Sequence, residues 1–188
     1  MMPPLGPGKL WWRDDDAVAD TPALRRLLAL ASQHQVPLTL AVVPGKLQPC
    51  LPSLIKAHPH VEVVLHGWRH ENHALSGKSE YPAERPATDV AREMRDGLEC
   101  LQEAFGSQCL PVLTPPWNKI ANEHLQTVFD SGVRAISTIG HHDGPHFYPV
   151  QLDLLQWRPP PPRFKGLEIC QKALSTFINN HSYTGVLS

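Results

Sequence analysis

The chain has 188 residues, a length that fits one domain with a core large enough to fold without disulfides. Its 17 Lys and Arg residues nearly balance its 18 Asp and Glu residues, and the formal net charge of −1 argues against nucleic acid as a partner. No stretch is apolar for long enough to cross a membrane, the first residues lack a secretory-signal pattern, and the 4 cysteines show no C-x-x-C spacing. We therefore expect a single domain over residues 1–188, located in the cytoplasm and without a membrane partner.

The first half of the chain alternates between short apolar segments and amphipathic ones. A helix is predicted to begin at Thr21 and Pro22, because threonine is a favoured N-cap residue and proline suits the first helical turn. A long polar loop over residues 74–86 follows the third apolar segment. The predicted strands in this half are residues 9–13, 36–44 and 61–65, and a second, short helix covers residues 52–57.

The clearest helix covers residues 88–105, where apolar residues recur every three or four positions and Gly106 follows the last of them. Strands that alternate with helices favour a parallel sheet with helical crossovers. Six or seven such units are too few for an eight-fold barrel of about 250 residues. The remaining predicted strands are residues 110–114, 133–137 and 152–157 and a last one from residue 184, and the remaining helices are residues 121–130 and 167–180.

Two polar motifs follow predicted strands. Asp14, Asp15 and Asp16 come directly after an aromatic run, and His66 and His70 come after the third predicted strand. Each motif alone is ambiguous, because adjacent aspartates are often solvated or act as caps and a His-x-x-x-His pair is a weak signal. Together, a carboxylate and two imidazoles at strand ends predict a divalent-metal site with open coordination positions.

These motifs resemble the polysaccharide deacetylase family of carbohydrate esterases (the NodB-homology domain), and the resemblance extends over nearly the whole chain. It implies an α/β fold, a distorted (β/α) barrel with six or seven parallel strands of which the final one is incomplete. It also implies that Asp14 is the general base and that Asp15, His66 and His70 bind the metal, with Zn²⁺ expected first and Co²⁺, Mn²⁺, Fe²⁺ or Ni²⁺ as alternatives. Asp16 is interpreted as a cap where the chain turns toward the next helix.

The family's third motif is usually Arg-x-Pro-aromatic, and Thr114 occupies the arginine position in this sequence. The family arginine hydrogen-bonds the catalytic aspartate, so Asp14 needs another partner, for which Arg13 and Arg85 are candidates. Asn118 is interpreted either as a substrate contact or as the cap of the helix after it. The residues expected to contact the substrate are Trp117, Pro116, Asn118, His73 and Arg13.

The family's last motif, an apolar residue followed by one residue and a histidine on the final strand, supplies the general acid. Leu187 and Ser188 occupy its first two places. We therefore expect the natural chain to continue with a histidine within one or two positions of Ser188. If it does not, His141 and His142 are the candidate acids.

The resemblance implies hydrolysis of an acyl group, most simply acetyl, from an N-acylated sugar or a similar small amide. A non-haem iron oxygenase also uses two histidines and one carboxylate, although a neighbouring carboxylate base suits hydrolysis better. A metal-binding or ligand-binding domain without catalysis is the second alternative. The oligomeric state is left open. Outside the motifs, surface positions are expected for His58, His60 and His124, and core positions for Trp11 and Trp12.

Overall fold

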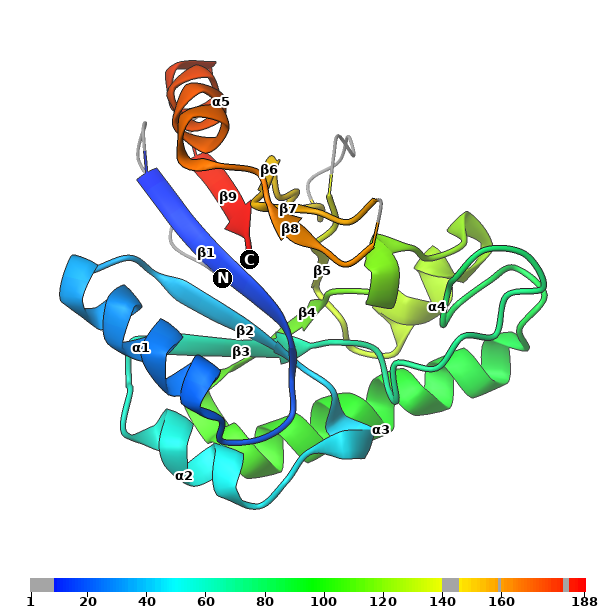
Figure 1. Cartoon of the computed structure of the whole chain (residues 1–188). Helices are drawn as coiled ribbons and strands as arrows, with labels where there is room; N and C mark the ends of the chain where they lie inside the picture. The colour runs from blue at the N-terminus through cyan, green and yellow to red at the C-terminus, as the bar shows by residue number, and fades with distance from the viewer. Residues whose placement is uncertain (1–8, 140–145, 159, 181–182) are drawn as a thin grey trace.

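The computed structural model describes residues 9–139, 146–158, 160–180 and 183–188. Within them, seven strands form one parallel sheet in the order β5-β4-β3-β2-β1-β9-β6. The sheet curves into a half-barrel (Figure 1), which confirms the predicted distorted (β/α) barrel. Its strands are β1 (Lys9–Ala17), β2 (Leu38–Val42), β3 (Val61–Leu65), β4 (Cys109–Leu113), β5 (Ala135–Ile136), β6 (Leu152–Asp153) and β9 (Tyr183–Leu187).

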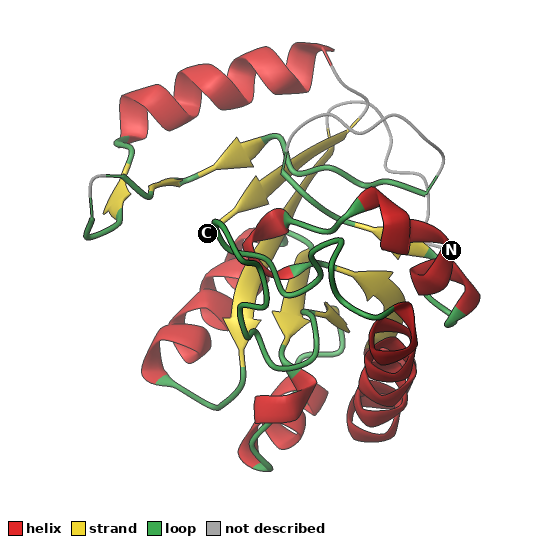
Figure 2. Cartoon of the chain, turned by 90° about the vertical axis from the view of Figure 1, so that its right-hand side faces the viewer, coloured by secondary structure: helices red, strands yellow, loops and turns green. Residues whose placement is uncertain are grey.

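Helices cover the outer side of the sheet (Figure 2). In the first of them, the Thr21 hydroxyl accepts the N–H of Leu24 and Pro22 opens the first turn, as predicted. The third ends at Gly106, which has a positive φ of 56°. The helices are α1 (Pro22–His34), α2 (Cys50–Lys56), α3 (Ala87–Phe105), α4 (Leu125–Asp130) and α5 (Leu167–Asn180), with 3₁₀ turns η1 (Pro44–Lys46), η2 (Gly106–Gln108), η3 (Pro116–Asn118) and η4 (Asn122–His124).

The main core lies between strands β1 to β4 and the helices that cover them. All five residues of β2 are buried, as expected for a central parallel strand that is covered on both faces. Trp11 is buried in a second, smaller cluster with Val150 and Leu187, and Trp12 packs against the main cluster. Both tryptophans are therefore core residues, as predicted. None of the described helices is long and apolar enough to span a membrane.

The C-terminal part departs from the prediction. Residues 152–157 do not form one strand, because the chain bends after Asp153, whose carboxylate accepts the N–H of Leu155 at 2.7 Å. The next strand, β7 (Leu155–Gln156), leaves the main sheet and pairs antiparallel with β8 (Arg163–Phe164). Two-residue strands are too short to give a periodic apolar signal, so this hairpin was not predicted. The last strand, β9, pairs with β1 on one side and with β6 on the other.

Candidate metal centre

Strand β1 contains the whole aspartate triplet, and its alternation separates neighbouring residues. Successive side chains of a strand point to opposite faces, so Arg13 and Asp15 share one face while Trp12 and Asp14 share the other. The ion pair between Arg13 and Asp15 is consistent with this arrangement, since Arg13 Nε lies 2.9 Å from Asp15 Oδ1. Asp14, the predicted general base, therefore points away from the face that holds Arg13 and Asp15.

Asp14 has surroundings of its own. Its Oδ1 accepts a hydrogen bond of 2.8 Å from the Ser188 hydroxyl. It lines a cavity of about 400 Å³ that extends to Leu24 and Leu27 of α1 and that Asp15 and Asp16 also border. Burial raises the pKa of Asp14 to about 6, against the lowering effect of the Ser188 hydrogen bond.

The third aspartate faces the two histidines because the backbone changes direction. Asp16 has a φ of 68°, and the pairing of β1 with β2 is irregular between Asp14 and Ala17. Such bulges re-aim side chains beside functional sites. Asp16 Oδ1 lies 3.3 Å from His66 Nε2 and 3.2 Å from His70 Nε2. These three residues form the one group of at least three potential metal ligands among the described residues, with ligand atoms within 4.8 Å of one another.

His66 is held in the tautomer that a metal requires. It follows β3 and is only 2% exposed. Its Nδ1 lies 2.8 Å from the carbonyl oxygen of Thr114, and a carbonyl can only accept, so Nδ1 carries the proton. In the neutral imidazole, Nε2 is then the nitrogen with the free lone pair, and it lies 3.3 Å from Asp16 Oδ1, where a proton or a metal ion can be shared between them. A backbone carbonyl that orients a ligand histidine in this way is a common second partner in metal sites.

His70 lies on the loop after β3, next to an aromatic wall. Its ring centroid is 5.1 Å from that of His66 and 4.3 Å from that of Trp117. His70, Trp117 and Asn118 all have φ near 55°, a left-handed conformation that non-glycine residues rarely adopt and that concentrates at functional sites. The Lys78 ammonium lies 5.8 Å from the centre of the Trp117 ring. Two strained turns, one at His70 after β3 and one at Trp117 and Asn118 after β4, therefore lie side by side. We call this region, at the C-terminal ends of the strands, the mouth of the half-barrel.

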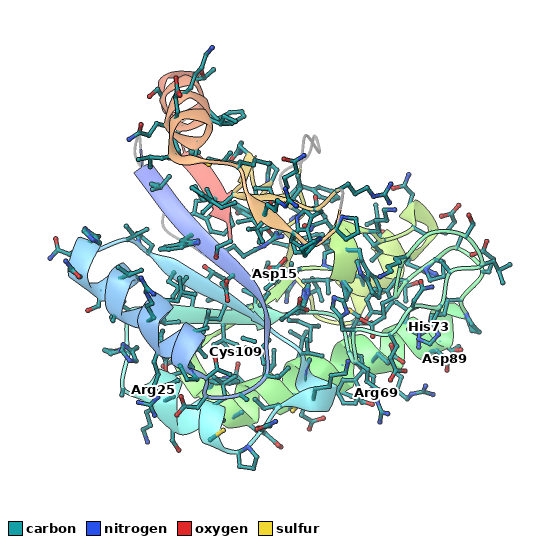
Figure 3. All side chains as sticks on the ribbon, viewed as in Figure 1. Asp15, Arg25, Arg69, His73, Asp89 and Cys109 are labelled. Atoms are coloured by element: carbon teal, nitrogen blue, oxygen red, sulfur yellow. The ribbon has the colours of Figure 1, made fainter. Side chains whose placement is uncertain are left out.

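Arg13 connects the β1 side of the site to the opposite strands. It is fully buried, and its Nη2 donates to Asp15 Oδ2 at 3.0 Å and to Asn118 Oδ1 at 2.7 Å. Its Nη1 donates to Ser137 Oγ at 2.8 Å. The carboxylate of Asp15 is therefore occupied by a cation of the protein, while Asp16 is left to face the histidines. Figure 3 shows Asp15 in the interior, inside the curve of the sheet.

Burial and neighbouring charges set the pKa values of the cluster. The hydrogen bond with His66 holds the pKa of Asp16 below its usual value, so Asp16 is ionised at neutral pH. Burial lowers the pKa of His70, which leaves its imidazole neutral and able to bind a metal. Burial acts in the same direction on His66, but the carboxylates of Asp16 and Asp15 raise its pKa overall. The negative field that attracts a proton here also favours a divalent cation.

The structure thus brings together part of the predicted site. His66 and His70 lie beside Asp16, which had been interpreted as a cap, and not beside Asp15. The period of two predicts that Arg13 and Asp15 share a face, but it would also place Asp14 and Asp16 together on the other face, so it does not separate the three aspartates without the backbone change at Asp16.

The predicted substrate contacts Trp117 and Asn118 also lie at the mouth of the half-barrel. Arg13 was predicted to contact the substrate as well, but it is fully buried and bonds to Asp15, Asn118 and Ser137 instead.

The other predicted residues have different positions. Pro116 is buried against Gly67, whereas His73 is exposed and lies farther out than Asp15 (Figure 3). Arg85 pairs with Glu93 and so does not orient an aspartate of the triplet. The surface position expected for His124 was wrong, because that residue is 3% exposed and its Nε2 lies 2.8 Å from the carbonyl oxygen of Pro82. His141 and His142 lie outside the described residues.

Comparison with known proteins supports the fold. A scan against protein-family models and a search of curated proteins gave no match. The structure is similar to that of the polysaccharide deacetylase Bc1974 from Bacillus cereus, with a TM-score of 0.61 and 15% identity over 96% of this chain and 78% of that one. It is also similar to a family 4 acetyl xylan esterase from Clostridium thermocellum in complex with cobalt, with a TM-score of 0.57 and 15% identity over 95% of this chain and 72% of that one.

A third similar structure is that of IcaB from Ammonifex degensii, with a TM-score of 0.56 and 15% identity over 66% of this chain and 57% of that one. The chain therefore spans between 57% and 78% of the length of these three structures. The fold of the polysaccharide deacetylases, expected from the motifs, is confirmed at the level of the backbone.

Proposed function

We propose that this chain forms the catalytic part of a metal-dependent hydrolase that removes an acyl group from an N-acylated sugar or a similar small amide. The observation that carries the proposal is the cluster of Asp16, His66 and His70 at the mouth of a half-barrel with the polysaccharide deacetylase fold. One carboxylate and two imidazoles leave positions open on the metal for water and substrate, as a hydrolytic site requires.

The donor set fits Zn²⁺, and cobalt is bound by the structurally similar acetyl xylan esterase. The tautomer of His66, set by the Thr114 carbonyl, places a free lone pair where the ion would be held. When bound, a divalent ion supplies Lewis-acid polarisation of the acyl carbonyl and acidifies a water molecule. We therefore propose Asp16, His66 and His70 as the ligands, in place of the set with Asp15 that the sequence suggested.

Because the proposed ligand is Asp16 and not Asp15, we also propose Asp15, and not Asp14, as the general base. Asp15 directly precedes the proposed ligand in the chain, and its side chain is 15% exposed. Arg13 faces it with two nitrogens, which holds the carboxylate in one orientation. Asp15 can then accept the proton of the attacking water, whereas Asp14 points to the opposite face.

The substrate class follows from the wall of the site. Trp117 lies against His70, and an aromatic ring beside a catalytic centre offers the apolar face on which sugars commonly stack. Lys78 and Asn118 add polar groups at the same mouth. We propose a soluble saccharide or small amide as substrate, in the cytoplasm, and no nucleic-acid or membrane partner.

The test is acetate release from a panel of N-acetylated sugars under anaerobic conditions, with Zn²⁺, Co²⁺ or Mn²⁺ added to metal-free protein. We expect metal-dependent acetate release that His66→Gln abolishes and that His60→Gln, at an exposed histidine, leaves unchanged. No acetate in this assay, together with oxygen consumption in a parallel aerobic assay with Fe²⁺, would favour the oxygenase, which shares the donor set. Metal binding without any turnover would favour a non-catalytic domain.

A further inference from the structure

Glu80 is a buried carboxylate that the proposed chemistry does not use. It is 1% exposed, and no ion pair among the described residues includes it. Burying an ionised carboxylate is unfavourable unless donors surround it. Its donors are backbone N–H groups of the loop after β3: Arg69 donates to Oε1 at 2.8 Å and Trp68 donates to Oε2 at 3.2 Å.

These donors lie between the two histidines of the proposed metal site. The loop turns at Gly67 and again at His70, which have positive φ values of 61° and 54°. A Cβ added at Gly67 would overlap Glu80 Oε2, so the carboxylate lies directly against the turn. Successive N–H groups that converge on one anion form a nest, a conformation that the anion itself stabilises.

Further hydrogen bonds hold the backbone around Glu80 in place. Arg85 donates to the carbonyl oxygen of Glu80 at 3.1 Å and also pairs with Glu93 of α3. The hydroxyl of Ser79 accepts the N–H of Tyr81 at 3.1 Å. Glu80 therefore links the loop that carries His70 to the longest helix of the fold.

We propose that Glu80 is a positioning residue that holds the loop in the conformation in which His70 faces Asp16 and His66, and that it thereby sets the affinity for the metal. This inference rests on the proposed metal site. Without the carboxylate, the N–H groups of Trp68 and Arg69 would lose their acceptor, and the left-handed conformation of His70 would have less to support it. Outer partners of ligand residues commonly change metal affinity by about 10–100-fold.

The experiment measures Zn²⁺ affinity by competition with a chelator, at a temperature where circular dichroism shows each variant fully folded. Glu80→Gln keeps the shape, but its amide nitrogen cannot accept an N–H, so one of the two loop bonds is lost. We expect its Zn²⁺ Kd to rise by about 10–100-fold. Glu84→Gln is the matched control, because Glu84 is exposed on the same loop, and its Kd should equal that of the wild type.

The outcomes separate this inference from the proposed function. If the wild type does not bind Zn²⁺, the proposed metal site fails, and the inference fails with it. If the wild type binds and Glu80→Gln binds equally well, only the inference is overturned, even where the variant unfolds at a lower temperature, because a purely structural role would give that result. If Glu80→Gln does not fold, Glu80→Asp is measured instead; it keeps the charge but is one methylene too short to reach both N–H groups, and a Kd unchanged from the wild type would overturn the inference.

Discussion

The end of strand β1 and the loop after β3 together form the proposed metal centre, and they differ in how directly the sequence predicts their residues. The loop after β3 carries His66 and His70, and both residues predicted from the His-x-x-x-His spacing, read together with the aspartates, lie in the cluster. The end of β1 carries three consecutive aspartates; the sequence suggested Asp15 as the third ligand, whereas Asp16 is the aspartate that lies beside the histidines in the structure. This difference shows that residue types can indicate a candidate metal site, whereas the backbone conformation at the aspartates determines which carboxylate lies beside the histidines.

The largest effect is expected when one of the three proposed metal ligands is replaced. Asp16→Asn and His66→Gln should each weaken Zn²⁺ binding by more than about 100-fold, because a ligand of the ion is removed and not merely a partner of a ligand. Asp15→Asn should retain Zn²⁺. Metal analysis after dialysis checks this. Loss of metal from Asp15→Asn with retention by Asp16→Asn would restore the assignment made from the sequence.

The next effect separates the base from its two neighbours in the triplet. Asp15→Asn should lower kcat by about 10²–10⁴-fold with metal content unchanged, because the amide cannot take the proton of water. Asp14→Asn should stay within a few-fold of the wild type, since its side chain lies on the other face of β1. Steady-state kinetics on the best substrate of the acetylated panel decide it. A larger loss in Asp14→Asn than in Asp15→Asn would refute the alternation argument.

Replacing the buried arginine should affect stability as well as activity. Arg13→Met leaves Asp15, Asn118 and Ser137 without their common donor, and breaking a buried ion pair commonly costs about 3–5 kcal/mol. We expect the free energy of unfolding in urea to fall by this order. In the protein that remains folded, kcat should also fall, because Asp15 loses the donor that fixes the orientation of its carboxylate. An unchanged kcat would mean that Arg13 only supports the core.

A smaller effect concerns the pH dependence of stability on the Asp14 face. The folded pKa of Asp14, about 6, exceeds the ordinary value of 3.8 for an aspartate, so the folded state favours its protonated form. Its contribution is full below pH 3.8 and is lost as the pH rises through about 6, by about 3 kcal/mol in total for the metal-free protein. Asp14→Asn should remove this dependence. Urea unfolding at about pH 4 and about pH 7 compares the two proteins.

The smallest effect comes from the neighbour of Asp14. The Ser188 hydroxyl donates to the carboxylate and lowers its pKa against the effect of burial. Ser188→Ala should therefore raise the pKa of Asp14 further and reduce stability at neutral pH by about 1 kcal/mol. In the background of Asp14→Asn, the same substitution should have less effect on the pH dependence. Equal effects in both backgrounds would show that the two side chains are not coupled.

Much of the fold could be predicted from the sequence because its signals are local. The cap at Thr21 and Pro22, the apolar period of α3 and the apolar run of β3 each depend on neighbours within one element, and each element formed close to its predicted bounds. The same holds for the residue types of the site, because polar residues after buried strands collect at one edge of a parallel sheet. The hairpin of β7 and β8 had no such signal, since each strand has only two residues.

The surroundings and the orientation of the polar side chains were determined by the tertiary structure. Asp14, Asp15 and Asp16 are the same chemically, and their fates differ because β1 alternates, because Arg13 is buried beside Asp15, and because a bulge gives Asp16 a φ of 68°. His124 was expected at the surface, yet it is buried, and its Nε2 forms a hydrogen bond with the carbonyl oxygen of Pro82, 42 residues away in sequence. Partners distant in sequence and single backbone angles leave no periodic pattern in the chain, so only the folded structure could reveal them.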